Sequence, residues 1–301
     1  MLFRSHVVTS AADWWLGARP RTLPAAIVPV LIGTAVAVSE SEEVSAANAL
    51  PRVALALFVS LALQVGVNYA NDYSDGVRGT DDDRRGPMRL VAAGRATPAA
   101  VKTAALLALT SACVAGLVLA ALTTWWLILL GLACVAAAWL YTGGPQPYGY
   151  AGYGELFVFI FFGLVATVGT TYVVNESIGL LAWYSGAVSG CLSVALLMVN
   201  NIRDIDGDLR SGKRTLAVRL GPARSKGLFV VVYVVAGVLI IASSTQSLGA
   251  LLGLVGLLAA LPAIATVRES TEPKDLVRAL GMTARVQMLV GVLFAVGLIV
   301  R

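Results

Sequence analysis

Long apolar runs follow one another along almost the whole chain, and they constrain its fold more than any other feature. A membrane-spanning helix needs roughly 20 mostly apolar residues, and 58% of the 301 residues are hydrophobic. No polar stretch is long enough to form an attached soluble domain. We therefore expect one all-α integral membrane domain over 1–301, with an interfacial segment at 1–21 and a nine-helix bundle at 22–301. The predicted spans are 22–38, 53–71, 103–122, 125–141, 156–174, 178–199, 228–242, 248–267 and 284–300.

Positive charge is concentrated in alternate connecting segments. If the N-terminus lies inside, 20 of the 22 Lys and Arg residues fall in inner segments, and only Arg52 and Arg301 fall outside. Such an excess is typical of cytoplasmic loops. We therefore expect a multi-pass protein of the cell (cytoplasmic) membrane, with its N-terminus inside and its C-terminus outside. The net charge of +5 follows from this asymmetry, so nucleic acid is not an expected partner.

Histidine and cysteine usage argues against several kinds of chemistry. His6 is the single histidine, and the three cysteines all fall inside apolar runs. A histidine base, a histidine-rich metal site, a disulfide framework and a metal-thiolate site are therefore not expected.

The most polar stretch, residues 68–89, follows the second predicted span and holds five aspartates and four arginines. Asn68, Asp72 and Asp75 stand at i, i+4 and i+7, which places them on one face if the helix continues that far. A second acidic stretch follows the sixth span, where Asn200, Asp204 and Asp208 stand at i, i+4 and i+8. Both spans run in the same direction, so the two motifs are expected to face a shared central cavity on the cytoplasmic side.

These two motifs suit a divalent metal that holds a diphosphate. Mg²⁺ prefers oxygen ligands and bridges one or two carboxylates to phosphate oxygens, and cationic side chains stabilise charge on a departing diphosphate. The alternative is that these are solvated loop charges. If the motifs form a metal–diphosphate site, the metal ligands and catalytic aspartates are Asp72, Asp75, Asp204 and Asp208. Lys213 is catalytic and also binds diphosphate, together with Asn68, Asn200, Arg78, Arg89 and Arg214.

A third inner segment, 141–155, carries tyrosines on a Gly- and Pro-rich scaffold. Aromatic faces suit an aromatic acceptor or an allylic cation. The same composition is equally typical of an interfacial loop with turn-forming Gly and Pro. Two charged residues could also serve an acceptor: a base or orienting group at 155, and an arginine at 19 that could hold a carboxylate or act as a positive-inside anchor. The candidate acceptor-binding residues are Arg19, Tyr141, Tyr148, Tyr150 and Glu155.

Taken together, the motifs resemble the UbiA superfamily of intramembrane aromatic prenyltransferases. Asn71-Asp72-Tyr73-x-Asp75, Tyr141-Thr142-Gly143-Gly144-Pro145 and Asp208-x-x-x-Gly212-Lys213-Arg214 are similar to its 1,4-dihydroxy-2-naphthoate polyprenyltransferase branch. Gly79 stands where many members carry a third aspartate, and Asp81 follows two residues later.

The resemblance implies an enzyme of menaquinone synthesis. It would use Mg²⁺ to ionise a polyprenyl diphosphate, and 1,4-dihydroxy-2-naphthoate would attack the allylic cation and lose CO₂, giving a demethylmenaquinol. An enzyme with another acceptor, such as 4-hydroxybenzoate, is the alternative within the family. An ion-coupled transporter is the alternative from another class, and it predicts carboxylates near the bilayer midplane on broken helices.

Overall fold

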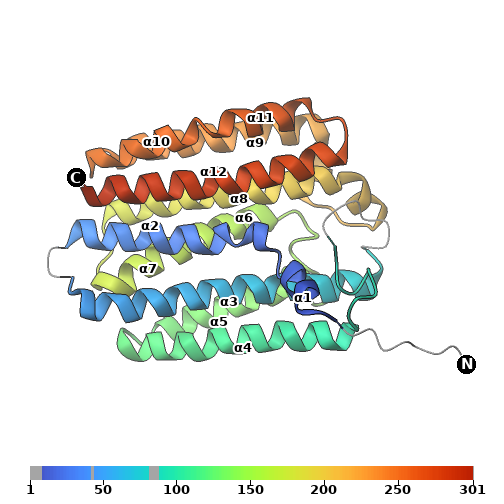
Figure 1. Ribbon diagram of the computed structural model, residues 1–301, viewed down its shortest axis with the longest axis horizontal. Helices are drawn as coiled ribbons and strands as arrows, with labels where there is room; N and C mark the ends of the chain where they lie inside the picture. Colours follow the sequence, from blue (N-terminus) through green and yellow to red (C-terminus); the bar gives the residue numbers. More distant parts are fainter. Residues whose placement is uncertain (1–8, 42–43, 81–87, 301) are drawn as a thin grey trace, which may run out of the picture.

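Long helices lie side by side in one elongated bundle, as the computed structural model shows (Figure 1). The structure describes residues 9–41, 44–80 and 88–300, and within them every regular element is helical. The all-α prediction is confirmed. The elements are α1 (Ala11–Gly17), η1 (Pro20–Thr22), α2 (Pro24–Glu40), α3 (Ala46–Arg78), α4 (Pro98–Leu122), α5 (Leu127–Leu140), α6 (Gly154–Val158), the π-helical η2 (Phe159–Val165), α7 (Ala166–Asn175), α8 (Leu180–Arg210), α9 (Leu216–Ser243), η3 (Leu248–Leu251), α10 (Leu252–Leu257), α11 (Ala260–Glu269) and α12 (Pro273–Val300).

Six helical stretches of the described chain are long and apolar enough to cross a membrane, and the number rises to eight if each of two bent pairs is one span. The bent pairs are residues 11–40, with a 52° bend, and residues 248–269, with a 40° bend. The shorter apolar helix α5 coincides with the predicted span 125–141. The protein is thus a multi-pass membrane protein, and the count of nine spans stays a prediction because it depends on α5.

Several helices extend beyond the predicted spans. α3 and α8 continue to Arg78 and Arg210, past the predicted ends at 71 and 199, whereas α9 and α12 begin at Leu216 and Pro273, before the predicted starts at 228 and 284. Hydropathy marks only the apolar part of a helix, but the backbone hydrogen bonds continue through polar turns. As a result, both Asn-x-x-x-Asp motifs lie entirely on helices.

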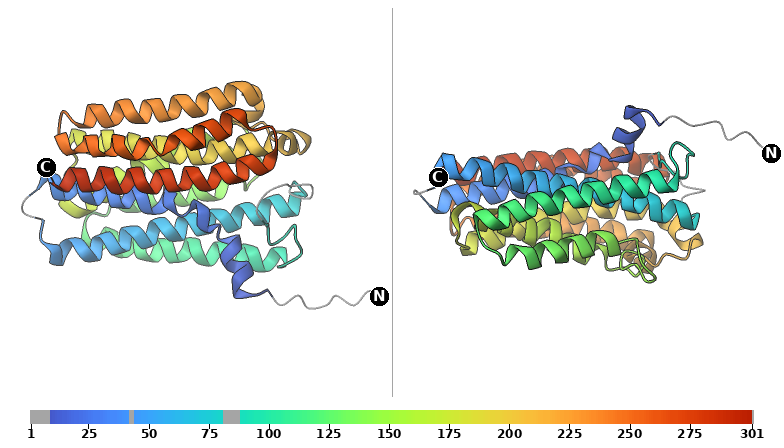
Figure 2. Two further views of the ribbon diagram at one scale, coloured as in Figure 1. Left: turned by 45° about the horizontal axis from the view of Figure 1, so that its top comes forward. Right: turned by 90° about the horizontal axis from the view of Figure 1, so that it is seen from below.

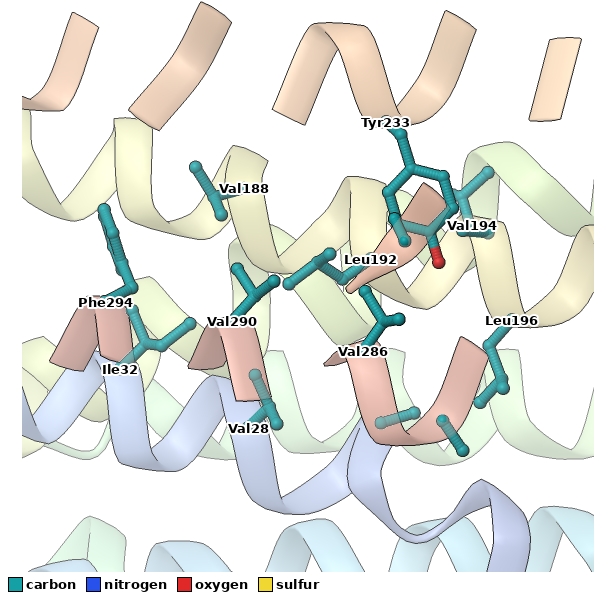
Figure 3. Packing of buried hydrophobic residues seen from close by; sticks show 14 of the residues in the cluster. Val28, Ile32, Val188, Leu192, Val194, Leu196, Tyr233, Val286, Val290 and Phe294 are labelled. Carbon is teal, nitrogen blue, oxygen red and sulfur yellow. The ribbon is translucent and has the colours of Figure 1, made fainter. Parts of the chain in front are cut away.

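The main core lies where α2, α8, α9 and α12 meet. Figure 3 shows aliphatic and aromatic side chains of these helices pointing toward one another. Glycines bring some elements very close: a Cβ on Gly249 would lie 2.0 Å from the carbonyl oxygen of Gly297. Small residues at such crossings are typical of membrane helices, because close backbone approach supplies the packing. The labelled core residues are Val28, Ile32, Val188, Leu192, Val194, Leu196, Tyr233, Val286, Val290 and Phe294.

The polar ends of α3 and α8 lie at the same end of the bundle. Helix α1 and the connection 141–153 lie at that end too, whereas α12 ends at the opposite one (Figures 1 and 2). The two acidic motifs therefore share one end of the molecule, as the common direction of the two spans predicted.

Candidate functional site

A cavity of about 480 Å³ runs from this polar end into the apolar part of the bundle. Its apolar part is lined by α3, α4, α5 and the α6–η2–α7 stretch, including Phe157, Phe161 and Phe162. Part of the lining is exposed, such as Leu117 on α4 and Leu132 on α5. Polar side chains gather at the other end: Arg19, Gln64, Asn68, Asn71, Asp75, Arg89, Asn200, Asn201, Asp204, Asp208 and Lys213.

The first motif divides between two faces of α3. Asn68, Asn71 and Asp75 line the cavity, whereas Asp72 does not. The Asp72 carboxylate, only 1% exposed, accepts hydrogen bonds from the backbone N–H groups of Leu90 (2.7 Å) and Val91 (3.0 Å). Successive helix residues point about 100° apart, so neighbouring positions reach different surroundings. The structure therefore separates Asp72 from the other acidic residues of the predicted site.

Asp75 is the centre of a buried charge cluster. The Lys213 ammonium lies 3.1 Å from Asp75 Oδ1 and 4.0 Å from Asp208 Oδ1, so it bridges the two acidic helix ends. Arg89 places a guanidinium nitrogen 3.7 Å from Asp75 Oδ2, and the Tyr150 hydroxyl donates to Asp75. Lys213 also lies 4.6 Å from the centre of the Tyr150 ring, a favourable cation–π distance.

On α8, all three predicted residues line the cavity. Asp204 accepts two hydrogen bonds from the side chain of Arg203, at 2.8 and 2.7 Å. Asp208 accepts one from the Thr215 hydroxyl at 3.4 Å. The Asn200 amide donates to Leu196 of its own helix at 3.3 Å. The α8 carboxylates are therefore held by neighbours close to them in the sequence.

The aromatic loop forms one wall of the polar end. Tyr141, Tyr148 and Tyr150 line the cavity, and Tyr148 stacks on Phe157 with ring centres 4.0 Å apart. Burial raises the pKa of both Tyr148 and Tyr150 above the ordinary tyrosine value. These phenols are therefore neutral near pH 7 and can donate hydrogen bonds.

Besides Asp72, three predicted site residues lie outside the cavity lining. Arg78 is exposed and donates to the Thr142 and Gly144 carbonyls at 2.5 and 2.6 Å, and the exposed Arg214 bonds the Tyr150 carbonyl through its backbone N–H at 2.8 Å. Glu155 is buried behind the wall and accepts from Asn201 at 2.9 Å. Arg78 and Arg214 thus hold the aromatic loop in place.

Arg19, by contrast, lines the cavity. Its backbone has a φ of 56°, in the left-handed region, and its guanidinium donates to the Asn68 carbonyl at 3.4 Å. This turn lies between α1 and η1 and directs a cation toward the polar end.

Two asparagines that the sequence analysis did not name as candidate site residues also line the cavity. Asn71 accepts a hydrogen bond from the Thr142 hydroxyl at 2.7 Å, which links α3 to the aromatic loop. Asn71 precedes Asp75 by four residues, the same spacing that separates Asn68 from Asp72. This spacing could have identified Asn71 as a site residue from the sequence. Asn201 directly follows Asn200 in the second motif.

The chemistry of the polar end suits a magnesium ion. Within residues 9–41, 44–80 and 88–300, no group of three or more Asp, Glu, His or Cys side chains is arranged to hold a metal. Mg²⁺ needs fewer protein ligands than that, because it keeps several waters and binds phosphate oxygens. Asp75 and Asp208, both within 4.0 Å of the Lys213 ammonium, carry hard oxygen donors that would suit such an ion. Asp81 lies outside the described residues.

Comparisons with known proteins agree with this architecture. The UbiA prenyltransferase family matches residues 26–296. A Mycobacterium tuberculosis (strain ATCC 25618 / H37Rv) protein described as 1,4-dihydroxy-2-naphthoate octaprenyltransferase is 48% identical, over 96% of this chain and 97% of that protein. A Mycobacterium leprae (strain TN) protein with the same description is 47% identical over 89% and 90%.

Solved structures show the same fold at low identity. The apo structure of a UbiA homolog from Aeropyrum pernix K1 has a TM-score of 0.70 at 16% identity, covering 91% of this chain and 97% of that one. A UbiA homolog from Archaeoglobus fulgidus bound to DMAPP and Mg²⁺ has a TM-score of 0.60 at 13% identity, covering 94% and 99%.

Proposed function

The chain belongs to the UbiA prenyltransferase family, and from that premise we propose that it prenylates 1,4-dihydroxy-2-naphthoate. The donor is a polyprenyl diphosphate, and the product is a demethylmenaquinol of menaquinone synthesis. The observation that carries the proposal is the cavity, in which carboxylates of both acidic helices and cations of the adjoining segments lie at one end of a long apolar groove. Such a groove accommodates an isoprenoid tail while its diphosphate meets the charged end.

In the reaction, the allylic C–O bond breaks and the diphosphate leaves with the electron pair. A ring carbon of the acceptor forms the new C–C bond, and the acceptor carboxylate leaves as CO₂, returning its electron pair to the ring. A strong base is therefore not required. This fits a polar end whose tyrosines are neutral and whose described residues include no histidine.

We assign roles to the residues of the polar end. Asp75, Asp204 and Asp208 are the candidates to hold Mg²⁺, which when bound neutralises diphosphate charge and stabilises it as a leaving group. Lys213 and Arg89 are cations next to Asp75 and would turn to the diphosphate oxygens. Arg19 is the candidate partner for the acceptor carboxylate.

The aromatic wall serves the carbocation. The ring faces of Tyr150 and Tyr148 stabilise a nearby cation, and the phenylalanines of α6 and η2 exclude water that would otherwise capture it. We also propose that the polar end faces the cytoplasm, in the cell membrane, because the inner segments carry nearly all the positive charge.

The test is an activity assay with purified protein in detergent. It contains Mg²⁺, a long-chain polyprenyl diphosphate and 1,4-dihydroxy-2-naphthoate, with 4-hydroxybenzoate as the parallel acceptor. A prenylated, decarboxylated naphthoquinol that forms only with metal, and is lost in Asp75→Asn, is the expected result. Turnover with 4-hydroxybenzoate alone would overturn the proposed acceptor, and no turnover with either acceptor would contradict the proposal.

A further inference from the structure

Helix α3 presents two parallel rows of side chains near its polar end. Asn68, Asn71 and Asp75, at i, i+3 and i+7, line the cavity. Tyr69, Asp72 and Gly76 have the same spacing, one residue later. The second row packs against the segment 88–97 instead of the cavity. Its carboxylate, Asp72, therefore has a different role from Asp75.

Segment 88–97 is fitted closely against this second row. Leu90 is fully buried, and its carbonyl accepts from the N–H groups of Arg95 (2.8 Å) and Ala96 (3.1 Å), which closes the segment on itself. The absence of a side chain at Gly76 makes room for Val91, since a Cβ there would lie 2.4 Å from Val91 Cγ1. Side-chain packing and hydrogen bonds therefore both hold Leu90 and Val91 in place against α3.

Arg89 directly precedes the two residues that Asp72 holds. Its side chain is 7% exposed, lines the cavity, and reaches to 3.7 Å from Asp75. The placement of this cation at the polar end thus depends on a backbone segment that Asp72 anchors from the other side of α3.

We propose that Asp72 is a positioning residue: through the Leu90 and Val91 amides it holds Arg89 at the diphosphate end of the cavity, and it is not a metal ligand. The inference rests on the proposed function and replaces the metal-binding role that the motif predicted for Asp72. As a metal ligand, Asp72 would have to turn away from both amides, leaving two donors without the acceptor they have here.

The test measures geranyl diphosphate binding by calorimetry in detergent while Mg²⁺ is titrated. Asp72→Asn and Arg89→Gln should each weaken diphosphate binding roughly tenfold, the size of a coupled contact. The double variant should be no weaker than Arg89→Gln alone, because both changes remove one effect. The Mg²⁺ concentration for half-maximal binding should stay unchanged in Asp72→Asn but rise in Asp75→Asn, the reference variant.

A second pair of variants leaves the Asp72 carboxylate intact. Gly76→Ala should displace Val91 and weaken diphosphate binding as Asp72→Asn does, and Gly76→Ala/Val91→Ala should restore binding by relieving the clash. A raised Mg²⁺ requirement in Asp72→Asn, additivity with Arg89→Gln, or normal binding by Gly76→Ala would each overturn the inference. If wild-type protein itself shows no Mg²⁺-dependent diphosphate binding, the proposed function fails first, and the inference fails with it.

Discussion

Lys213 is expected to act as a built-in cation that holds the two acidic helices together when no metal is bound. Its ammonium lies 3.1 Å from Asp75 Oδ1, and the two side chains are 9% and 4% exposed. Coulomb's law at an effective dielectric constant of about 20 gives roughly 5 kcal/mol for unit charges at that distance, and removing one partner of a buried pair costs about 3–5 kcal/mol. Lys213→Met should therefore lower the melting temperature by roughly 6–20 °C.

The assay is thermal unfolding in detergent, with and without Mg²⁺. Metal alone should stabilise Lys213→Met more than wild type, because in wild type it must displace the ammonium; a ligand at about 100 times its Kd adds about 2.7 kcal/mol. Lys274→Met is the matched control, since Lys274 pairs with Glu272 at 2.8 Å but is 77% exposed, and it should cost less than about 1 kcal/mol. Equal melting of Lys213→Met and wild type, or equal stabilisation of both by Mg²⁺, would refute the reasoning.

Three further predictions concern the cavity walls. Asn71→Leu should lower turnover roughly tenfold, because it removes the acceptor of the Thr142 hydroxyl and a buried hydrogen bond is worth about 1 kcal/mol or more; steady-state kinetics would show it, and unchanged turnover would contradict it. Gly131→Leu should reduce turnover of long prenyl diphosphates more than of geranyl diphosphate, because a side chain at this lining position meets nothing within 4 Å and enters the groove; competition between the two donors measures this, and equal losses would be the contrary result. Burial and the nearby Asp75 raise the pKa of Tyr150, so the hydrogen bond that its neutral hydroxyl donates should stabilise the fold fully below the ordinary tyrosine pKa of about 10 and be lost as pH rises through the higher folded-state pKa. Tyr150→Phe should therefore lower the melting temperature at pH 8 and make the melting temperature fall less steeply above pH 10. Parallel pH profiles of the melting temperature for variant and wild type would argue against this role.

The sequence predicted the helices well because spanning a membrane imposes a simple requirement on apolar length. Every predicted span coincides with a helix or a bent pair in the described residues. The polar ends were harder to delimit, since hydropathy does not report where a helix stops. Gly221, with a φ of 75°, marks a kink inside α9, ahead of the predicted span that begins at 228.

The site was predicted less completely because side-chain direction depends on the neighbouring elements. Both Asn68–Asp72 and Asn71–Asp75 have i, i+4 spacing, and the sequence alone does not say which pair faces the cavity. Arg78 and Arg89 are likewise equivalent as charges, yet Arg78 binds loop carbonyls whereas Arg89 is buried next to Asp75. The docking of segment 88–97 on α3 decides both questions.

The exposed lining of the cavity on α4 and α5 has a consequence for kinetics. Leu117 and Leu132 line the groove and are 50% and 60% exposed, so under the proposed function an isoprenoid tail in this open groove would be continuous with the surrounding lipid. Donor and product then exchange laterally within the membrane, a two-dimensional phase. The concentration that governs saturation is therefore the mole fraction of donor in the bilayer or micelle, and adding inert lipid or detergent should slow the enzyme by surface dilution even when the bulk amount of substrate is unchanged.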